Sequence, residues 1–116
     1  MATISAIVSY PDGAAQVLTM SAAGAQALTI KGRKTLIDGV TTEATGNRTI
    51  NLTIDSEVII GSEIVVRSKS NGTETLTFGT GITSAVSTGV AGKTINQAFV
   101  YDGTAFVAAG AEQQID

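Results

Sequence analysis

The chain has 116 residues, the length of one ordinary domain, and we expect a single domain over residues 1–116. It contains no cysteine and no histidine, which excludes disulfides, catalysis by cysteine or histidine, and the usual zinc sites. Seven basic and ten acidic residues give a net charge of -3, the wrong sign for a nucleic-acid-binding surface. We therefore expect no nucleic-acid partner, no cofactor, and a structural role in preference to an enzymatic one.

The first residues predict a short strand and no targeting signal. Residues 1–8 have no basic start and no apolar run of about 7–15 residues, so they do not predict a signal peptide. Residues 3–9 alternate weakly and precede Tyr10-Pro11-Asp12-Gly13, where proline fixes φ and glycine permits a positive φ. We expect a strand followed by a turn. No run of about 20 apolar residues occurs in the chain, and we expect no membrane association.

Three short β-prone runs follow, at residues 16–20, 26–30 and 34–37. The first two are separated by Ser21-Ala22-Ala23-Gly24, and Gly32 interrupts the chain before the third. An alanine-rich helix over residues 14–27 is the alternative, but the threonine, valine and glycine within it lower its helix propensity. We expect strands.

The clearest alternation in the chain is at residues 48–54. It places Ile50, Leu52 and Ile54 on one face and polar residues on the other, as in a half-buried strand. The stretch before it, residues 39–46, is bounded by glycines and is expected to be a loop, as is the glycine-containing stretch 79–92.

The sequence predicts a hairpin around Ser70-Asn71-Gly72, with strands at residues 63–69 and 73–78. A two-residue loop would mix polar and apolar side chains on each face. A three-residue loop pairs Val66 with Leu76 and Ile64 with Phe78, so it is the register that we predict.

A second hairpin closes the chain, with strands at residues 95–101 and 104–109 around Asp102-Gly103. A two-residue turn pairs Phe99 with Phe106 on the face toward the core. The opposite face is also apolar and needs cover from another sheet or a neighbouring subunit, which predicts self-association. That face carries Ala98, Val100, Ala105 and Val107.

The carboxylates form no recognisable catalytic or metal-binding motif. Asp55 and Glu57 are the best candidates for paired-carboxylate chemistry, because residues two apart on a strand share a face, but a solvated turn explains both. Asp38 and Asp102 precede glycines at expected turns, where aspartate accepts nearby backbone N–H groups. Their spacing is too wide for a calcium site. We assign no catalytic residue and no metal ligand.

The few aromatic residues divide into two groups. We expect Phe78, Phe99 and Phe106 to pack in the core. Tyr10 and Tyr101 stand beside turns and are the side chains available for stacking against a sugar. Because aromatic residues make up only 4% of the chain, this use is the lesser expectation.

Composition predicts an all-β fold. Thirteen glycines, one proline and abundant threonine, isoleucine and valine are typical of short strands joined by tight turns. We predict a single-domain antiparallel β-sandwich or jelly-roll-like barrel of about 8–9 short strands. No strict period of about 20–50 residues recurs, which argues against a solenoid or propeller. Charged residues make up only 15%, so the polar surface is largely neutral and suits packing against copies or a larger assembly.

Residues 47–109 resemble a known group of proteins. The stretches that carry the resemblance are Arg48-Thr49-Ile50-Asn51-Leu52, Val65-Val66-Arg67, Thr75-Leu76-Thr77-Phe78 and the closing Phe99-Val100-Tyr101-Asp102-Gly103-Thr104. They look like the small β-rich virion proteins of tailed bacteriophages, which include capsid decoration proteins, head fibres and tail-fibre modules. Residues 1–46 resemble this group only in composition.

The resemblance implies a non-enzymatic virion protein, commonly a trimer. Because the chain has no coiled-coil heptads and no collagen-like repeat, a compact capsid decoration protein fits better than a fibre. We expect it on the outside of the phage head, after synthesis in the host cytoplasm, bridging major capsid subunits. The alternative is a head- or tail-fibre module that binds a cell-surface glycan through loops 39–46 and 79–92 with Tyr10 or Tyr101.

Two segments are the candidate interfaces. Residues 2–9 can add as a terminal strand to the edge of a capsid sheet, although they can equally close the protein's own sheet. The second segment is the outward face of the closing hairpin. The candidate residues are Ala2, Thr3, Ile4 and Ser5 in the first segment, and Ala98, Val100, Ala105 and Val107 in the second.

Overall fold

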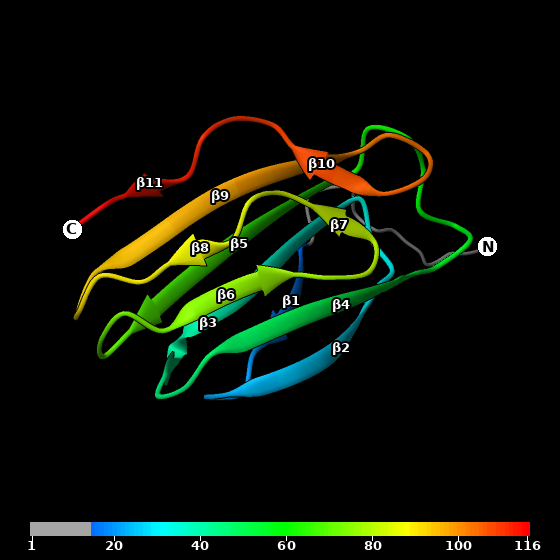
Figure 1. The fold of residues 1–116 in the computed structure, drawn as a ribbon. Coiled ribbons are helices and arrows are strands. Elements are labelled where there is room, and N and C mark those ends of the chain that lie inside the picture. Colours follow the sequence, from blue (N-terminus) through cyan, green and yellow to red (C-terminus); the bar gives the residue numbers. More distant parts are fainter. Residues whose placement is uncertain (1–14) are drawn as a thin grey trace.

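The computed structural model describes residues 15–116, and every regular element in that range is a β-strand (Figure 1). The strand expected over residues 3–9 and the turn after it lie outside the described residues. No helix forms over residues 15–27, so the strand prediction there is confirmed. The strands are β1 (Gln16–Thr19), β2 (Gly24–Ile30), β3 (Lys34–Ala44), β4 (Arg48–Ile54), β5 (Glu63–Ser70), β6 (Thr75–Phe78), β7 (Ile82–Thr83), β8 (Ser87–Thr88), β9 (Thr94–Tyr101), β10 (Phe106–Ala108) and β11 (Gln113–Gln114).

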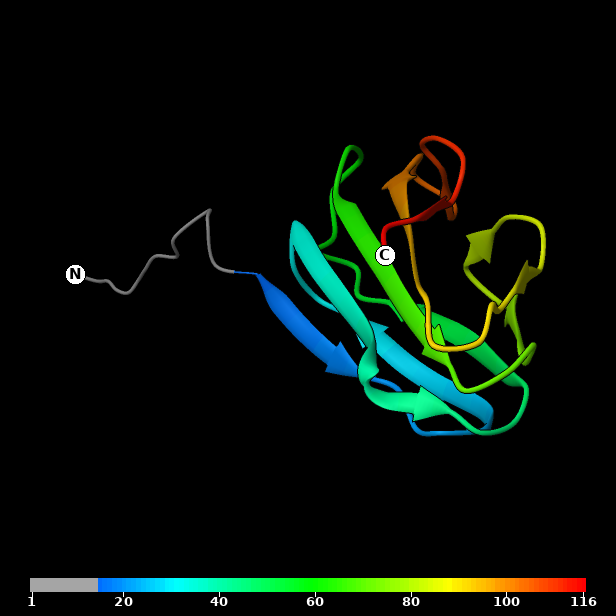
Figure 2. The ribbon, with the colours of Figure 1, turned by 90° about the vertical axis from the view of Figure 1, so that its left-hand side faces the viewer.

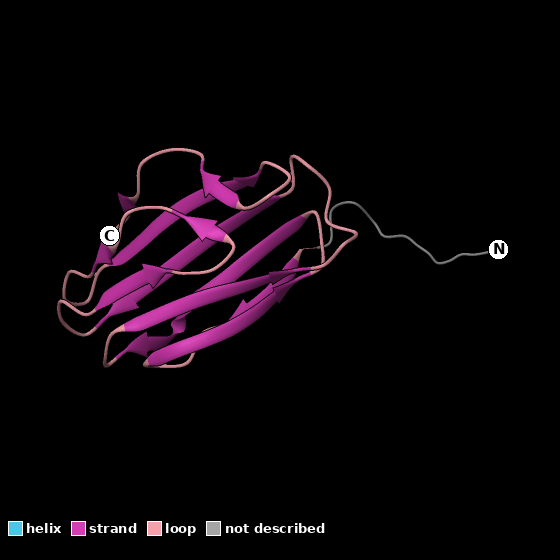
Figure 3. Ribbon diagram, turned by 45° about the vertical axis from the view of Figure 1, so that its right-hand side comes forward, coloured by secondary structure: helices cyan, strands magenta, loops and turns pink. Residues whose placement is uncertain are grey.

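These eleven strands, more than the eight or nine expected, form two sheets (Figure 3). The larger sheet has the order β1-β3-β5-β9-β10-β7, with β11 beside β9, and the smaller has the order β2-β4-β6-β8. From β1 to β6 the chain crosses to the other sheet after every strand. Figure 2 shows β1 as the outermost strand on one side of the fold. The described residues contain no helix that could cross a membrane.

The expected antiparallel arrangement is wrong for the first half of the fold, and also for β7, which pairs with β10 in parallel. β1, β3 and β5 pair in parallel, and so do β2, β4 and β6. A strand that returns to its own sheet only after crossing the other runs in the same direction as its predecessor. The stacking of these parallel strands resembles that of a solenoid, in which each circuit of the chain adds one strand to each sheet. The sequence has no fixed period because the circuits differ in length: Gln16 pairs with Thr35, whereas Lys34 pairs with Glu63.

The hairpin predicted around residues 70–72 does not form. β5 belongs to the larger sheet and β6 to the smaller, so the connection passes from one sheet to the other instead of folding back within one sheet. Ser70 is buried at this crossing, where its hydroxyl donates to the carbonyl of Gly72 at 2.6 Å and its own carbonyl accepts from the N–H of Gly92 at 2.9 Å. The strand partners of β5 are β3 and β9, whereas those of β6 are β4 and β8.

The closing hairpin forms between β9 and β10, but its register differs from the prediction by two residues. Phe106 lies opposite Tyr101 and not opposite Phe99. The Asp102 carboxylate accepts the N–H groups of Thr104 and Ala105 at 2.8 and 2.9 Å, which widens the turn. A shift of two residues keeps every side chain on its predicted face.

The core lies between the two sheets and joins side chains from both. As predicted, Ile50 and Leu52 of β4 are buried, with Ile54 packed against them. Phe99 and Phe106 are fully buried, and the Phe78 ring lies 5.1 Å from that of Phe99. The prediction of phenylalanine in the core is therefore confirmed.

Candidate functional site

The outward face of the larger sheet brings together the four hairpin residues predicted as an interface. Ala98 is exposed, and Val100, Ala105 and Val107 are half-buried, whereas Phe99 between them points into the core. Val100 pairs directly with Val107 across the hairpin. The other four predicted interface residues lie outside the described residues; these are Ala2, Thr3, Ile4 and Ser5.

The apolar surface extends beyond the hairpin to residues that sequence reasoning missed. Val17, Leu36, Val65 and Ala98 are register partners across β1, β3, β5 and β9, so their side chains form one row on the outer face. Val17 is 59% exposed and Val65 is 36% exposed. We call these four residues the apolar row. A signal existed in the sequence, because Leu36 and Val65 each stand beside a buried apolar residue, and consecutive apolar residues mark a strand apolar on both faces.

Charged residues flank the apolar row on both sides. Lys34 pairs with Glu63 two residues before the row, and Asp38 pairs with Arg67 two residues after it. We call these the charged pairs. The order of signs on β3 is positive then negative, and on β5 it is negative then positive. Arg67 also donates to the Asn96 side chain at 3.2 Å on the neighbouring strand.

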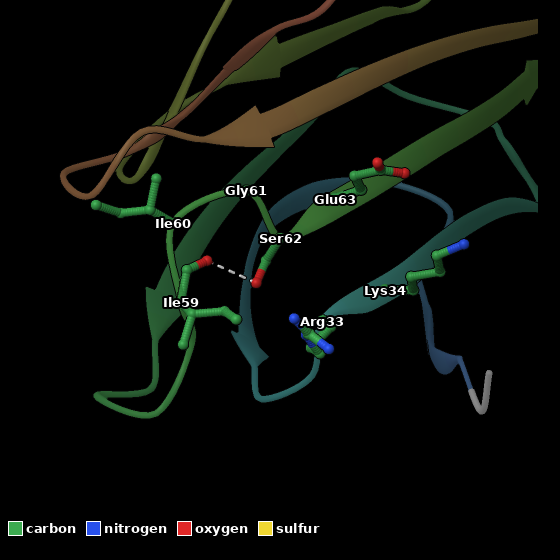
Figure 4. Close-up of a pocket in the computed structure, with 7 residues that line it drawn as sticks. All are labelled: Arg33, Lys34, Ile59, Ile60, Gly61, Ser62 and Glu63. Carbon is green, nitrogen blue, oxygen red and sulfur yellow. Dashed lines mark hydrogen bonds between the residues drawn. The ribbon is translucent and has the colours of Figure 1, made fainter. Parts of the chain in front are cut away.

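A second exposed apolar surface lies at the end of the fold where β1 begins. The loop between β4 and β5 carries Ile59 and Ile60, which are 48% and 73% exposed. Beside them is an open groove of about 560 Å³. Figure 4 shows Ile60 pointing away from Lys34 and Glu63, which flank the other side of the groove. The groove is lined by Arg33, Lys34, Ile59, Ile60, Gly61, Ser62 and Glu63. We call Ile59, Ile60 and this groove the loop-end surface.

The backbone around the groove is already bonded within the protein. Ser62 donates its hydroxyl to the Ile59 carbonyl at 2.7 Å, and its carbonyl accepts the Tyr101 N–H at 2.8 Å. The Gly61 N–H donates to the Tyr101 carbonyl at 2.9 Å. The Glu63 N–H donates to the Arg33 carbonyl at 2.8 Å. What the groove offers to a partner is therefore mainly side-chain surface, namely two isoleucines and the charges of Arg33, Lys34 and Glu63.

The carboxylates serve as local acceptors for the backbone. Asp55 accepts the Glu57 N–H at 3.0 Å, which confirms the turn interpretation of this pair. Asp38 accepts the Thr41 hydroxyl at 2.6 Å and the Val40 N–H at 2.8 Å, and these bonds hold the pKa of its carboxyl below the usual value. Within residues 15–116 no three acidic side chains are grouped closely enough to hold a metal ion.

Tyr101 is not available as a flat stacking surface. Its ring lies 5.2 Å from that of Phe106 and packs against the core, and its hydroxyl donates to the Gly103 carbonyl at 3.0 Å. Tyr10, the other candidate, lies outside the described residues. The expected loop at residues 39–46 is also different, because β3 continues to Ala44 with a register shift after Gly39.

Arg48 holds in place the irregular stretch of β3 that follows Gly39. Its side chain is only 1% exposed, and its guanidinium donates five hydrogen bonds. The acceptors include the carbonyls of Gly39 and Thr42 and the Ser68 hydroxyl. Gly39 must be glycine, because a Cβ there would lie 2.8 Å from the Arg67 carbonyl oxygen and 3.0 Å from the guanidinium. Burial lowers the pKa of Arg48, and arginine remains charged even so.

The described residues thus include two exposed apolar surfaces, one on the outer sheet face and one at a loop end, besides the exposed side chains of Val86, Val90 and Ile115. The buried polar groups serve the fold. Comparison with protein families, with curated proteins and with solved structures finds no match for this chain.

Proposed function

We propose that this protein is a non-enzymatic capsid decoration protein of a tailed bacteriophage, with the major capsid protein as its partner. It binds the outside of the assembled head, after synthesis in the host cytoplasm, and bridges neighbouring subunits. The resemblance of residues 47–109 to small phage virion proteins supports this role, and so does the β-rich, sandwich-like body.

The observation that carries the proposal is the presence of two separate apolar surfaces on one small body. A bridging protein has to contact at least two neighbours at once, here the capsid at one surface and a second copy of the protein at the other. Val17 and Val65 lie on the outer sheet face, whereas Ile59 and Ile60 lie at the loop end, so one contact does not obstruct the other. Exposed apolar patches of this kind mark protein interaction sites.

We assign the capsid contact to the loop-end surface and to residues 2–9. The chain enters β1 at this end, because Gln16 pairs with Thr35, the neighbour of the groove residue Lys34. Residues 2–9 add as a strand to a capsid sheet edge, and the isoleucines fill an apolar depression beside it. A ligand that binds only the assembled shell stabilises the shell by mass action.

The test is co-sedimentation of the purified protein with capsids that lack it. We expect saturable binding that raises the disruption temperature of the shell. The Ile60→Asp variant should bind at least about tenfold more weakly, because a charge replaces a central apolar contact. Deleting residues 1–9 should weaken binding similarly. The matched control is Val86→Asp, which changes a valine that is 52% exposed on another loop.

Equal binding by Ile60→Asp, Val86→Asp and the unchanged protein would remove the loop-end surface from the proposal. Absence of any capsid binding would refute the decoration role. The fibre module would then become the better interpretation, and a cell-surface glycan would be the next ligand to test.

A further inference from the structure

The outer face of the larger sheet has a charge pattern that is complementary to itself. Along β3, Lys34 and Asp38 stand two residues before and two residues after Leu36, and along β5, Glu63 and Arg67 stand equally far from Val65. Residues two apart on a strand are about 6.6 Å apart. The charged pairs therefore lie at equal distances on either side of the apolar row, with opposite signs at corresponding positions.

We propose that two copies of the protein pack face to face through this sheet, about a two-fold axis that runs across the strands along the apolar row. This rotation places the apolar row of one copy on that of the other. It also places Lys34 opposite Asp38 of the second copy, and Glu63 opposite Arg67 of the second copy.

The physical reason for the pairing is that the apolar row and the charged pairs both gain from being covered by a second copy. Val17 and Val65 leave water, which is the main favourable contribution to association. Four ion pairs flank the buried row, and their complementarity sets the orientation of the two sheets more than the affinity. An interface of this kind uses the same patch on both subunits, so it closes at two copies.

This arrangement differs from the trimer implied by the resemblance, and it does not rest on the virion role. It leaves Ile59 and Ile60 outside the contact, whereas Lys34 and Glu63, which also line the groove, lie at the border of the contact. The paired molecule thus keeps Ile59 and Ile60 of both copies free for other partners.

The first experiment measures the mass of the isolated protein in solution by light scattering. We expect twice the chain mass of 11.7 kDa at micromolar concentration. The Val65→Lys variant should be monomeric, because it places two ammonium groups against each other at the centre of the contact. The matched control is Thr53→Lys, which adds the same charge to an exposed position of β4 on the other sheet. It should remain a dimer.

A charge exchange then tests the orientation. Glu63→Lys places a lysine opposite Arg67 of the second copy, and Arg67→Glu places a glutamate opposite Glu63. Each variant alone should dissociate at least about tenfold more readily than the unchanged protein. An equimolar mixture of the two variants should recover the dimer, because both facing pairs are then of opposite sign. Denaturant unfolding of each variant confirms that it is folded.

Three outcomes would overturn the proposal. These are a monomer or a trimer for the unchanged protein, a dimer that persists in Val65→Lys, and failure of the mixed variants to recover association. The last result would exclude this axis specifically. With an axis parallel to the strands, Glu63 would lie opposite Lys34 of the second copy, and mixing the two variants would leave charges of like sign facing each other. Capsid binding is measured separately, so its failure leaves this result unaffected.

Discussion

At the scale of single residues, Arg48 is the side chain on which the irregular part of the fold depends. A buried cation is costly unless its donors are satisfied, and here backbone carbonyls from three parts of the chain satisfy them. These acceptors belong to Ser21, Gly39 and Lys69, which lie far apart in the sequence. One guanidinium thus ties together the connection between β1 and β2, the irregular part of β3 and the end of β5.

We expect Arg48→Met to lower the free energy of unfolding by about 3 kcal/mol, because it leaves several buried carbonyls without a donor. Urea denaturation followed by circular dichroism measures this change. Arg67→Met is the control, since Arg67 is half-buried with a single side-chain hydrogen bond to Asn96, and it should cost less than about 1 kcal/mol. Equal losses in the two variants would contradict this role for Arg48.

At the scale of the strands, local pattern predicted which residues are extended but not how the strands pair. The alternation at residues 48–54 identified β4 and its buried face correctly. The turn sequence at residues 70–72 suggested a hairpin, although β5 and β6 lie in different sheets. A short loop of polar residues can connect two strands of one hairpin or two strands in different sheets. The partner of β5 is therefore decided by burial of its inner face against the other sheet.

The parallel pairing of β2 and β4 can be tested by cross-linking, because the chain has no cysteine of its own. Ala25 and Thr49 are register partners. Neighbouring strands lie about 4.8 Å apart, within the range that a disulfide spans. We expect Ala25→Cys with Thr49→Cys to oxidise to an intramolecular disulfide, detected as the loss of two free thiols.

The control for this cross-link is Ala25→Cys with Thr53→Cys, which is displaced by four residues along the same strand. That pair should remain reduced under the same conditions. Oxidation of the displaced pair in preference to the aligned pair would show that the register of β2 on β4 is different.

At the scale of the whole molecule, three aspartates fasten separate parts of the fold. Asp38 holds the irregular part of β3, Asp102 closes the last hairpin, and Asp116 accepts the N–H of Thr94 at 2.6 Å at the start of β9. For Asp38 the Thr41 hydroxyl is the main cause of its lowered pKa, and for Asp102 and Asp116 the main causes are the N–H groups of Ala105 and Thr94.

These lowered pKa values predict how stability depends on pH. A carboxyl with a lowered pKa in the folded state stabilises the fold fully above its ordinary value, which is 3.8 here, and loses that contribution as the pH falls further. We expect the unfolding midpoint in urea to be constant from pH 7 to about pH 5 and to fall below pH 4. A variant with Asp38→Asn and Asp102→Asn should show a shallower fall. An equally steep fall in that variant would exclude these two carboxyls as the cause.

The amino-acid sequence by itself determined the all-β class, most strand positions, the buried phenylalanines and the apolar outward face of the closing hairpin. These follow from local preference and from the period of two along a strand, which short stretches contain. Only the tertiary structure decided the rest. Parallel pairing, the apolar row that joins Val17 to Val65, and the burial of Arg48 all depend on which distant segments meet. Circuits of unequal length leave no fixed period from which that could have been predicted.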